Sequence, residues 1–529
     1  MRLAAKFCNR ACRKAARGVL TLKRIHTVCL LSLLIGASPS VCRADGPAKP
    51  NVVLQGSITH AQNQTYLRVP FHVPAGVYRI TVTFHYTGKA QHTTLDLGIF
   101  DPQRFRGASG GNKDHFTISE TDATPSYLPG PLIAGRWVLS IAVPNIRQDV
   151  ISHYQANIFF DRKPRVESFS DGPLRPNPDW YRGDLHMHTG HSDGSCPDES
   201  GKPVPCPVFV TAEAAVRRGL DFIAITDHNT TSQYDAEREL QPYFNRLLFI
   251  PGREITTFQG HANLFGTTRF LDYRVGTPAV PDMNTVAREA HRLGAIVSIN
   301  HPKAPTGEIC LGCGWKPQPP VDLHLFSAIE AVNGGAMRGP YSGVSYWEEQ
   351  LQRGFRITAI GGSDNHHGDW PVSYADSVGS PTTVVYARNL SVSAILDGIR
   401  SGHVFIDLTG SRNRMLEMTA YVAGQPIASM GDALAAPAGS SLAITVHMVG
   451  CAGAKLEISV DKPNQLAFPA HTIAQDEETV HFTWPSDGKR HWLLPQVNMA
   501  EGDLELLGNP IYVNYAATKQ TGILSAGGH

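Results

Sequence analysis

The feature that most constrains the fold is a series of short apolar runs between residues 181 and 408, each followed by polar side chains. The runs span residues 222–226, 247–250, 296–299 and 357–360. Such runs are typical of parallel strands buried on both faces. Helical patterns alternate with them, at residues 211–218, 284–293 and 391–400. This alternation predicts an α/β fold.

The polar residues that follow the runs are of the types that bind metal ions. His186 and His188 alternate on a predicted strand, so their imidazoles point to the same face. The other candidates are Asp193, His228, Glu254, His261, His301, Asp364 and His366. Because functional residues gather at the carboxyl ends of barrel strands, we expect these side chains to converge. Imidazole and carboxylate ligands suit zinc, manganese or iron.

The motifs that carry these residues are DLHMHTGHSDG, TDHN, REITTFQGHANLFG, NHP and GGSDNHH. Together they resemble the PHP (polymerase and histidinol phosphatase) superfamily, and within it the CehA/McbA-like metallohydrolase branch. The resemblance covers roughly residues 181–408. It implies a distorted seven-stranded (β/α) barrel over residues 180–410 and two or three divalent metal ions.

The resemblance also implies how the ligands are shared among the metals. The first metal would be held by His186, His188, Glu254 and Asp364. The second would be held by Glu254, His261 and His301. The third would be held by Asp193, His228 and His366. Asp193 stands where some members of the family have histidine, which favours a weaker third site or a harder ion there.

Clustered cations would turn a bound water into a hydroxide nucleophile and polarise the scissile bond, which is the chemistry of a hydrolase. We expect a phosphoester substrate, because Arg253 could bind an anionic group. A carboxylester or carbamate hydrolase with the same metal site is the main alternative. A nuclease or nucleotide phosphatase and a non-catalytic binding module are further alternatives. The expected substrate is a small molecule.

Three polar residues beside the ligand motifs are candidate catalytic groups. Asp227 could assist proton transfer, although a carboxylate next to a metal-binding histidine more often orients that histidine. His191 and His367 could protonate a leaving group, or they could simply face solvent. Arg253 could equally form a structural ion pair.

Aromatic and histidine residues elsewhere have weaker claims. Trp315, Trp347 and Trp370 could line a pocket for an aromatic substrate, but loop and core packing is the favoured interpretation. His291 and His324 lie outside the motifs and are not expected to be ligands.

Alternating strand patterns flank the α/β region on both sides. They predict an N-terminal β-sandwich over residues 45–165 and a C-terminal β-sandwich over residues 411–517. A polar, proline-containing linker is expected at residues 163–179, and a flexible tail at residues 518–529. Packing is the default role of the sandwiches, with a glycan or protein partner left open.

The first 44 residues form a separate segment, in which basic residues between Arg2 and Arg24 precede an apolar run from Val28 to Ala37. This order is typical of a secretory signal peptide, and cleavage is expected before Asp45. A retained membrane anchor is the alternative, but the run is shorter than the ~20 residues that span a bilayer. We therefore expect an exported, periplasmic or secreted protein with no stable membrane span after cleavage.

Charge and cysteine content add two expectations. The formal net charge is only +1, which argues against an extended nucleic-acid partner. Export permits disulfides, and the natural local pairs are Cys196 with Cys206 and Cys310 with Cys313. A structural zinc site formed by these four cysteines is the alternative. Cys451 is left unpaired.

Overall fold

The computed structural model describes residues 49–515 apart from 112, 369, 372–374 and 423, and it begins with two antiparallel four-stranded sheets. The predicted signal segment and the predicted tail at 518–529 lie outside the described residues. The first sheet has the order β1 (Val52–Ile58), β8 (Ser152–Asp161), β3 (Arg79–Tyr86), β6 (His115–Ser119). The second has the order β2 (Tyr66–Val73), β7 (Gly135–Asn145), β4 (Thr94–Phe100), β5 (Phe105–Ser109).

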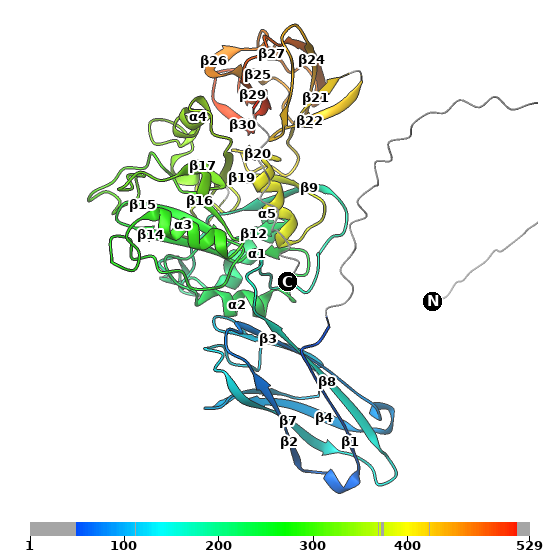
Figure 1. Cartoon of the computed structure of the whole chain (residues 1–529). Coiled ribbons are helices and arrows are strands. Elements are labelled where there is room, and N and C mark those ends of the chain that lie inside the picture. Colours follow the sequence, from blue (N-terminus) through cyan, green and yellow to red (C-terminus); the bar gives the residue numbers. More distant parts are fainter. Residues whose placement is uncertain (1–48, 112, 369, 372–374, 423, 516–529) are drawn as a thin grey trace, which may run out of the picture. The chain divides into compact units, whose positions relative to one another are not determined.

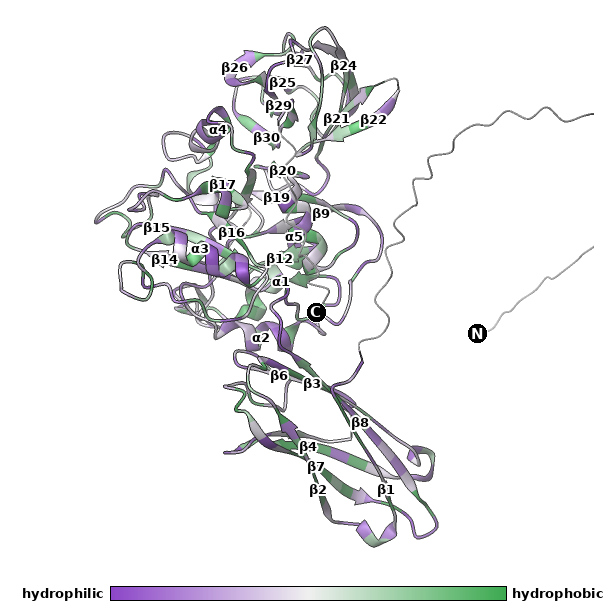
Figure 2. Ribbon diagram, in the orientation of Figure 1, coloured by the Kyte–Doolittle hydropathy of each residue, from purple (hydrophilic) through white to green (hydrophobic). Residues whose placement is uncertain are grey.

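These two sheets pack face to face because hydrophobic and polar residues alternate along their strands. In β3, for example, Ile80, Val82 and Phe84 are buried. Residues of both sheets, including Trp137 of β7, belong to one hydrophobic cluster. The alternation is visible as changing colour along the strands of Figure 2. The arrangement is that of a β-sandwich, as the alternating pattern predicts.

The central region contains a mixed five-stranded sheet and one end of a larger sheet (Figure 1). The five strands, in order, are β14 (Gly252–Thr257), β15 (Gly260–Phe265), β16 (Ile296–Ile299), β17 (Ala328–Asn333) and β18 (Thr358–Gly362). The larger sheet begins with β13 (Leu248–Phe249), β12 (Phe222–Ile223), β9 (Asp179–Asp184), β19 (Thr382–Ala387) and β20 (Val404–Asp407). A separate hairpin pairs β10 (Ser195–Pro197) with β11 (Pro203–Pro205).

The expected seven-stranded (β/α) barrel is wrong for the described residues. Mixed α/β structure is present, but the strands form two sheets and not one closed parallel barrel. A two-residue turn joins β14 to β15, so these strands are antiparallel where a barrel unit would insert a helix. β19 is likewise antiparallel to both of its neighbours. Isolated bridges, Met187 to Asn365 and His228 to Glu254, join segments next to the two sheets, and Thr383 of β19 exchanges hydrogen bonds with the backbone of Gly361 of β18.

Five α-helices accompany these sheets in the described residues: α1 (Val208–Arg218), α2 (Gln233–Leu240), α3 (Met283–Arg292), α4 (Val344–Gln352) and α5 (Val392–Ser401). The three helices predicted from the sequence are confirmed as α1, α3 and α5. Their ends follow local chemistry, because Asp282 and Ser391 accept hydrogen bonds from the first turns of α3 and α5. Gly402 ends α5 in a left-handed conformation.

The C-terminal strands continue the larger sheet and add a second one. The continuation from β20 is β30 (Leu504–Gly508), β29 (His491–Asn498), β25 (Lys455–Val460) and β26 (Lys462–Leu466), with β23 (Ala433–Leu434), β27 (His471–Thr472) and β31 (Ile511–Val513) beside them. The second sheet has the order β22 (Gln425–Ser429), β21 (Met415–Val422), β24 (Ser441–Val449), β28 (Glu477–Pro485). Both contribute to one hydrophobic cluster. The pairing of Ile406 with Leu507 makes this sandwich continuous with the central region.

The disulfide pairs predicted from the sequence, Cys196 with Cys206 and Cys310 with Cys313, are confirmed. The structural zinc alternative for these four cysteines is therefore wrong. Cys451 is a free, buried thiol. None of the helices in residues 49–515 has the length and hydropathy that a membrane span needs.

Candidate metal centre

The nine histidine and carboxylate residues predicted as ligands come together from six segments of the central region. His186 and His188 follow β9, and Asp193 lies in the turn after them. His228 follows β12, Glu254 lies on β14 and His261 on β15. The last three follow two strands of one sheet that are separated by β17, with His301 after β16 and Asp364 and His366 after β18. Residues far apart in the sequence thus share one buried cluster.

Glu254 is at the centre of the cluster. Its Oε1 lies 3.4 Å from His186 Nε2 and 3.3 Å from both His261 Nδ1 and His301 Nε2. Its Oε2 lies 2.8 Å from His228 Nδ1 and 3.7 Å from His188 Nε2. One fully buried carboxylate therefore faces five imidazoles, which is the position that a bridging carboxylate would occupy.

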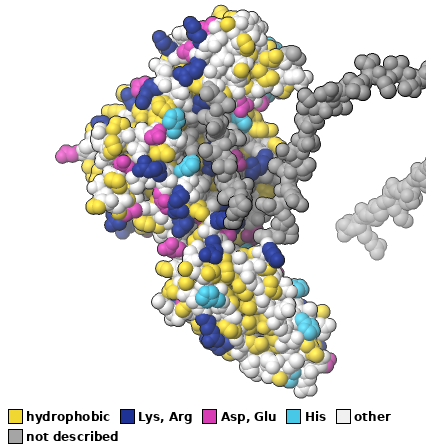
Figure 3. All heavy atoms as spheres, in the orientation of Figure 1, with side chains coloured by type: hydrophobic (Ala, Val, Ile, Leu, Met, Phe, Trp, Pro, Cys, Tyr) yellow, Lys and Arg dark blue, Asp and Glu magenta, His cyan; other side chains and the backbone are white. Residues whose placement is uncertain are grey.

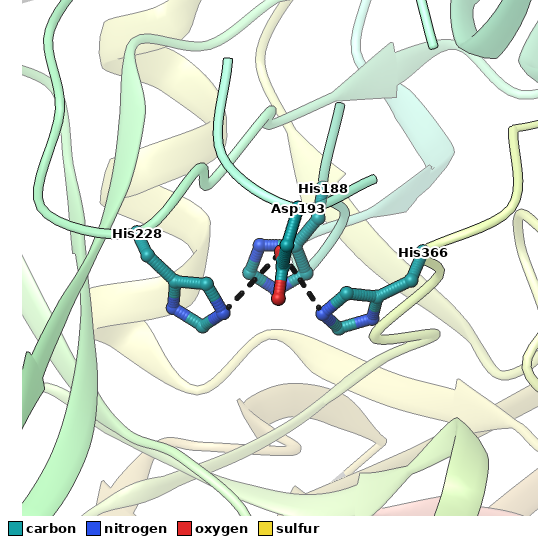
Figure 4. Close-up of side chains that lie close together, drawn as sticks. All are labelled: His188, Asp193, His228 and His366. Atoms are coloured by element: carbon teal, nitrogen blue, oxygen red, sulfur yellow. Dashed lines mark ion pairs between the residues drawn. The ribbon is translucent and has the colours of Figure 1, made fainter. Parts of the chain in front are cut away.

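Asp193 organises a second group at the more open side of the cluster (Figure 4). Its Oδ1 lies 3.4 Å from His366 Nε2 and 3.7 Å from His228 Nε2. His188 is buried, and its ring stacks on that of His366 with 4.1 Å between centroids. The Asp193 side chain is 59% exposed, so this group is reached from solvent.

Three sets of side chains could hold a metal ion, and they agree in part with the predicted ligand sets. The groups are His186, His188 and Asp364; His186, Glu254 and His301; and His188, Asp193, His228 and His366. The third contains all three ligands predicted for the third metal and adds His188. The first lacks Glu254, and the second has His186 in place of His261. His186 and His188 thus each belong to two groups.

The charges of the cluster depend on one another. Burial raises the pKa of Glu254, but His186, His261 and His228 outweigh it and hold this pKa well below its ordinary value. Burial lowers the pKa of His186, but Asp364, Glu330 and Glu254 outweigh it and hold this pKa well above its ordinary value. The cluster is therefore strongly polarised.

His188 is affected in the opposite direction. Burial, together with repulsion from His366 and His228, lowers its pKa to about 4 despite its hydrogen bond with Asp364. An imidazole in this position is neutral at physiological pH, and neutral imidazole is the form that binds metals.

Backbone strain and hydrogen bonds fix the ligands in place. His301 and Asp364 both have positive φ, 25° and 55°, which L-residues rarely adopt. Asn300 Nδ2 donates to Glu254 Oε1 at 2.8 Å, and Asn333 Nδ2 donates to Asp364 Oδ2 at 3.2 Å. The carboxylates are thus oriented before any ligand binds.

Glu330 is a functional residue that the sequence reasoning missed. It lies on β17, buried, with Oε1 2.8 Å from His186 Nδ1, and its Oε2 accepts from the backbone N–H of His301 at 2.8 Å. A carboxylate in this position fixes the orientation of His186. The available signal was a single acidic residue within the apolar run AIEAVN.

The four remaining predicted site residues are not in the three groups. Asp227 is buried and accepts hydrogen bonds from the backbone and hydroxyl of Thr189, each at 2.7 Å, and from Ser192 Oγ at 2.6 Å. It therefore positions the turn that carries Asp193. His191 Nδ1 lies 2.8 Å from Ser232 Oγ.

His367 and Arg253 contact residues that are not in the three groups. The His367 ring stacks on Trp370 with 3.6 Å between centroids, next to His366. Arg253 is fully buried and donates to the carbonyl oxygen of Arg269. Because alternate residues of a strand face opposite sides, Arg253 points away from the cluster that Glu254 enters, and the structure does not bring it to the substrate position.

Two of the three candidate tryptophans pack in the interior. Trp347 is fully buried and donates from Nε1 to the carbonyl oxygen of Ile357 at 2.9 Å. Trp315 is buried against Phe326.

The scan against protein-family models gave no match to this chain, and neither did the search of curated proteins.

Proposed function

We propose that the chain is an exported metal-dependent hydrolase that cleaves a phosphoester at the Glu254 cluster. The observation that carries the proposal is the convergence of three groups of histidine and carboxylate side chains around the buried Glu254, with possible ligand atoms that lie within 4.8 Å of one another in each group. Burying several imidazoles and carboxylates together is costly, and a cation is the partner that imidazole nitrogens and carboxylate oxygens share. The donor set fits zinc, manganese or iron.

The residues present could hold two or three such ions. Bound there, the ions would act as Lewis acids that activate water and polarise the scissile bond. The protein itself orients the ligands through Glu330 and Asn300, and it excludes solvent from the inner cluster. Asp227 holds the turn of Asp193, so it is a positioning residue and not a proton carrier in this proposal. A relationship to the PHP superfamily stays a proposal that the motifs support.

One observation keeps a carboxylester or carbamate substrate as a second candidate. Arg253, the residue expected to bind a phosphate group, is buried on the far face of β14 and does not face the cluster. The stacked pair of His367 and Trp370 adjoins the ligand His366 and offers a flat wall to an aryl ester. Charged side chains of both signs are interspersed on the face in Figure 3, which supports a small substrate over an extended nucleic acid.

The test is nitrophenol release from phosphomonoester, phosphodiester, carboxylester and carbamate derivatives of one chromophore, with metal-loaded protein, with and without chelator. We expect chelator-sensitive turnover, fastest on a phosphoester. Preference for the carboxylester or the carbamate would select the second candidate. No turnover on any linkage would overturn both and favour a binding module.

Variants locate the reaction. His186→Ala and Asp364→Ala should each abolish turnover and leave a folded protein, because His186 belongs to two of the three groups and Asp364 supplies the carboxylate of one of them. The matched control is His291→Ala, which changes an exposed histidine of α3 outside the cluster. Full activity in either ligand variant would place the reaction elsewhere.

A further inference from the structure

The tip of the β14–β15 hairpin and the loop after β16 expose three large apolar side chains. Phe258 is 94% exposed, Ile309 is 79% exposed and Leu311 is 75% exposed. Phe258 lies in the turn between β14 and β15, and the other two lie in the loop that follows His301. Water contact with so much apolar surface is unfavourable unless a partner covers it.

These side chains are carried by one platform, in which the hairpin and the loop contact each other. A Cβ on Gly312 would lie 3.0 Å from the Cα of Phe258, so the loop touches the hairpin next to Leu311. The backbone N–H of Lys316 donates to the carbonyl oxygen of Gln259 at 2.8 Å, and the disulfide between Cys310 and Cys313 closes the loop. The three side chains therefore protrude together.

The charges around this platform are mainly positive. Lys303 and Lys316 are exposed at the two ends of the segment, and Glu308 is its one acidic residue. The backbone N–H of Trp315 donates to the carbonyl oxygen of Pro302, which brings the two ends together. Protruding apolar side chains between lysines are complementary to an anionic lipid surface.

We propose that this apolar tip, formed by Phe258, Ile309 and Leu311, inserts into the surface of a lipid bilayer. A small apolar ligand is the other occupant to consider, but small ligands bind in concave sites that enclose most of their surface. Side chains that are three-quarters exposed or more enclose nothing, whereas they can enter the boundary between headgroups and acyl chains.

The tip lies beside the metal centre. His261 is three residues from Phe258 along the chain, which is at most ~10 Å even if the chain were fully extended, and His301 begins the loop. Insertion would hold the cluster close to the headgroups, so lipid phosphoesters would be its substrates. That consequence rests on the proposed hydrolase function, while the insertion itself does not.

The test is flotation of the full chain with phosphatidylcholine vesicles, with and without phosphatidylglycerol, at physiological salt. The variant F258S/I309S/L311S should partition about 1000-fold less, because burying each of the three side chains contributes about tenfold or more. The variant K303Q/K316Q should lose about fivefold per lysine, and only on vesicles that contain phosphatidylglycerol. All five positions are exposed, so the variants should keep the thermal midpoint of the wild type.

The matched control is Y66S/I151S, which removes side chains that are 77% and 60% exposed on the N-terminal sandwich and should float like the wild type. Equal flotation of the wild type and F258S/I309S/L311S would overturn the proposal. The proposal would also be overturned if the wild type did not float with vesicles but bound monomeric 1-octanol in equilibrium dialysis, and if that binding required the same three residues. Because flotation needs no turnover, a failed ester assay leaves this result intact.

Discussion

The buried charged groups around Asp122 and those around Glu254 are satisfied in opposite ways. Around Asp122, Arg79 donates to both carboxylate oxygens at 3.2 Å, and Arg238 and Ser119 donate as well. Around Glu254, several buried nitrogen and oxygen atoms lack a hydrogen-bond partner. Desolvation of buried charges is unfavourable in both clusters, but only around Asp122 do hydrogen bonds and ion pairs within the protein offset it.

The Asp122 cluster connects the N-terminal sandwich to the central region. Glu167, in the predicted linker, accepts from Arg79 at 3.0 Å and from the backbone N–H of Thr268 at 2.6 Å. The difference indicates a structural role for the fully hydrogen-bonded Asp122 cluster, whereas the Glu254 cluster combines unpartnered atoms with side chains that could hold a metal ion.

The largest effect is expected from Glu254→Gln. The amide keeps the shape and the oxygen that accepts from Asn300, but it loses the charge that several imidazoles face. Turnover should fall at least about 1000-fold, which is about 4 kcal/mol in activation free energy. The measurement is chelator-sensitive nitrophenol release, with circular dichroism to verify the fold. Retained turnover would remove Glu254 from the centre of the site.

The matched change in the other cluster is Asp122→Asn. It leaves the buried Arg79 and Arg238 without their shared negative partner, so the free energy of unfolding should fall by about 3 kcal/mol or more. Urea unfolding measures this loss. Turnover per folded molecule should stay at the wild-type level. A stable variant with impaired turnover would contradict the structural role of Asp122.

Metal addition should separate the two clusters further. A divalent ion at about 100 times its dissociation constant should raise the free energy of unfolding by about 2.7 kcal/mol in the wild type. The same gain is expected in Asp122→Asn, and none in Glu254→Gln. Thermal unfolding with manganese or zinc after chelator treatment tests this, and an equal gain in all three proteins would place the metal elsewhere.

The smallest of these effects concerns pH. Burial raises the pKa of Asp122, but Arg79 and Arg238 outweigh it and lower this pKa to about 2 from 3.8. A carboxyl group with a lowered pKa in the folded state stabilises the fold at pH values above its pKa in the unfolded chain. This contribution is lost as the pH falls from about 4 to about 2. The full loss should be about 2 kcal/mol, and about half of it is reached at pH 3. It is measured as the difference in unfolding free energy between wild type and Asp122→Asn at pH 6 and pH 3, which should shrink by about 1 kcal/mol between these pH values, and a pH-independent difference would contradict it.

Local patterns in the sequence were enough to predict three of the five α-helices of the described residues, several strands and the nine residues that converge on the cluster, but not α2 or α4. The strand at residues 296–299 and the helix that begins after Ser391 follow from apolar runs and capping, which depend on near neighbours. The alternation of His186 and His188 also predicts a shared face, and their ring centroids lie 5.2 Å apart.

The tertiary structure decided the rest, because it depends on partners distant in the sequence. Whether the strands close into a barrel was set by the antiparallel hairpin of β14 and β15, and the continuity of β20 with β30 was set by a pairing about 100 residues apart. Arg253 and Glu254 are charged neighbours in the sequence, but they lie on opposite faces of β14. Glu254 therefore faces the histidine cluster, whereas Arg253 contacts the carbonyl oxygen of Arg269. The role of Glu330 depended in the same way on His186, 144 residues away, because only folding brings an isolated buried carboxylate to its imidazole.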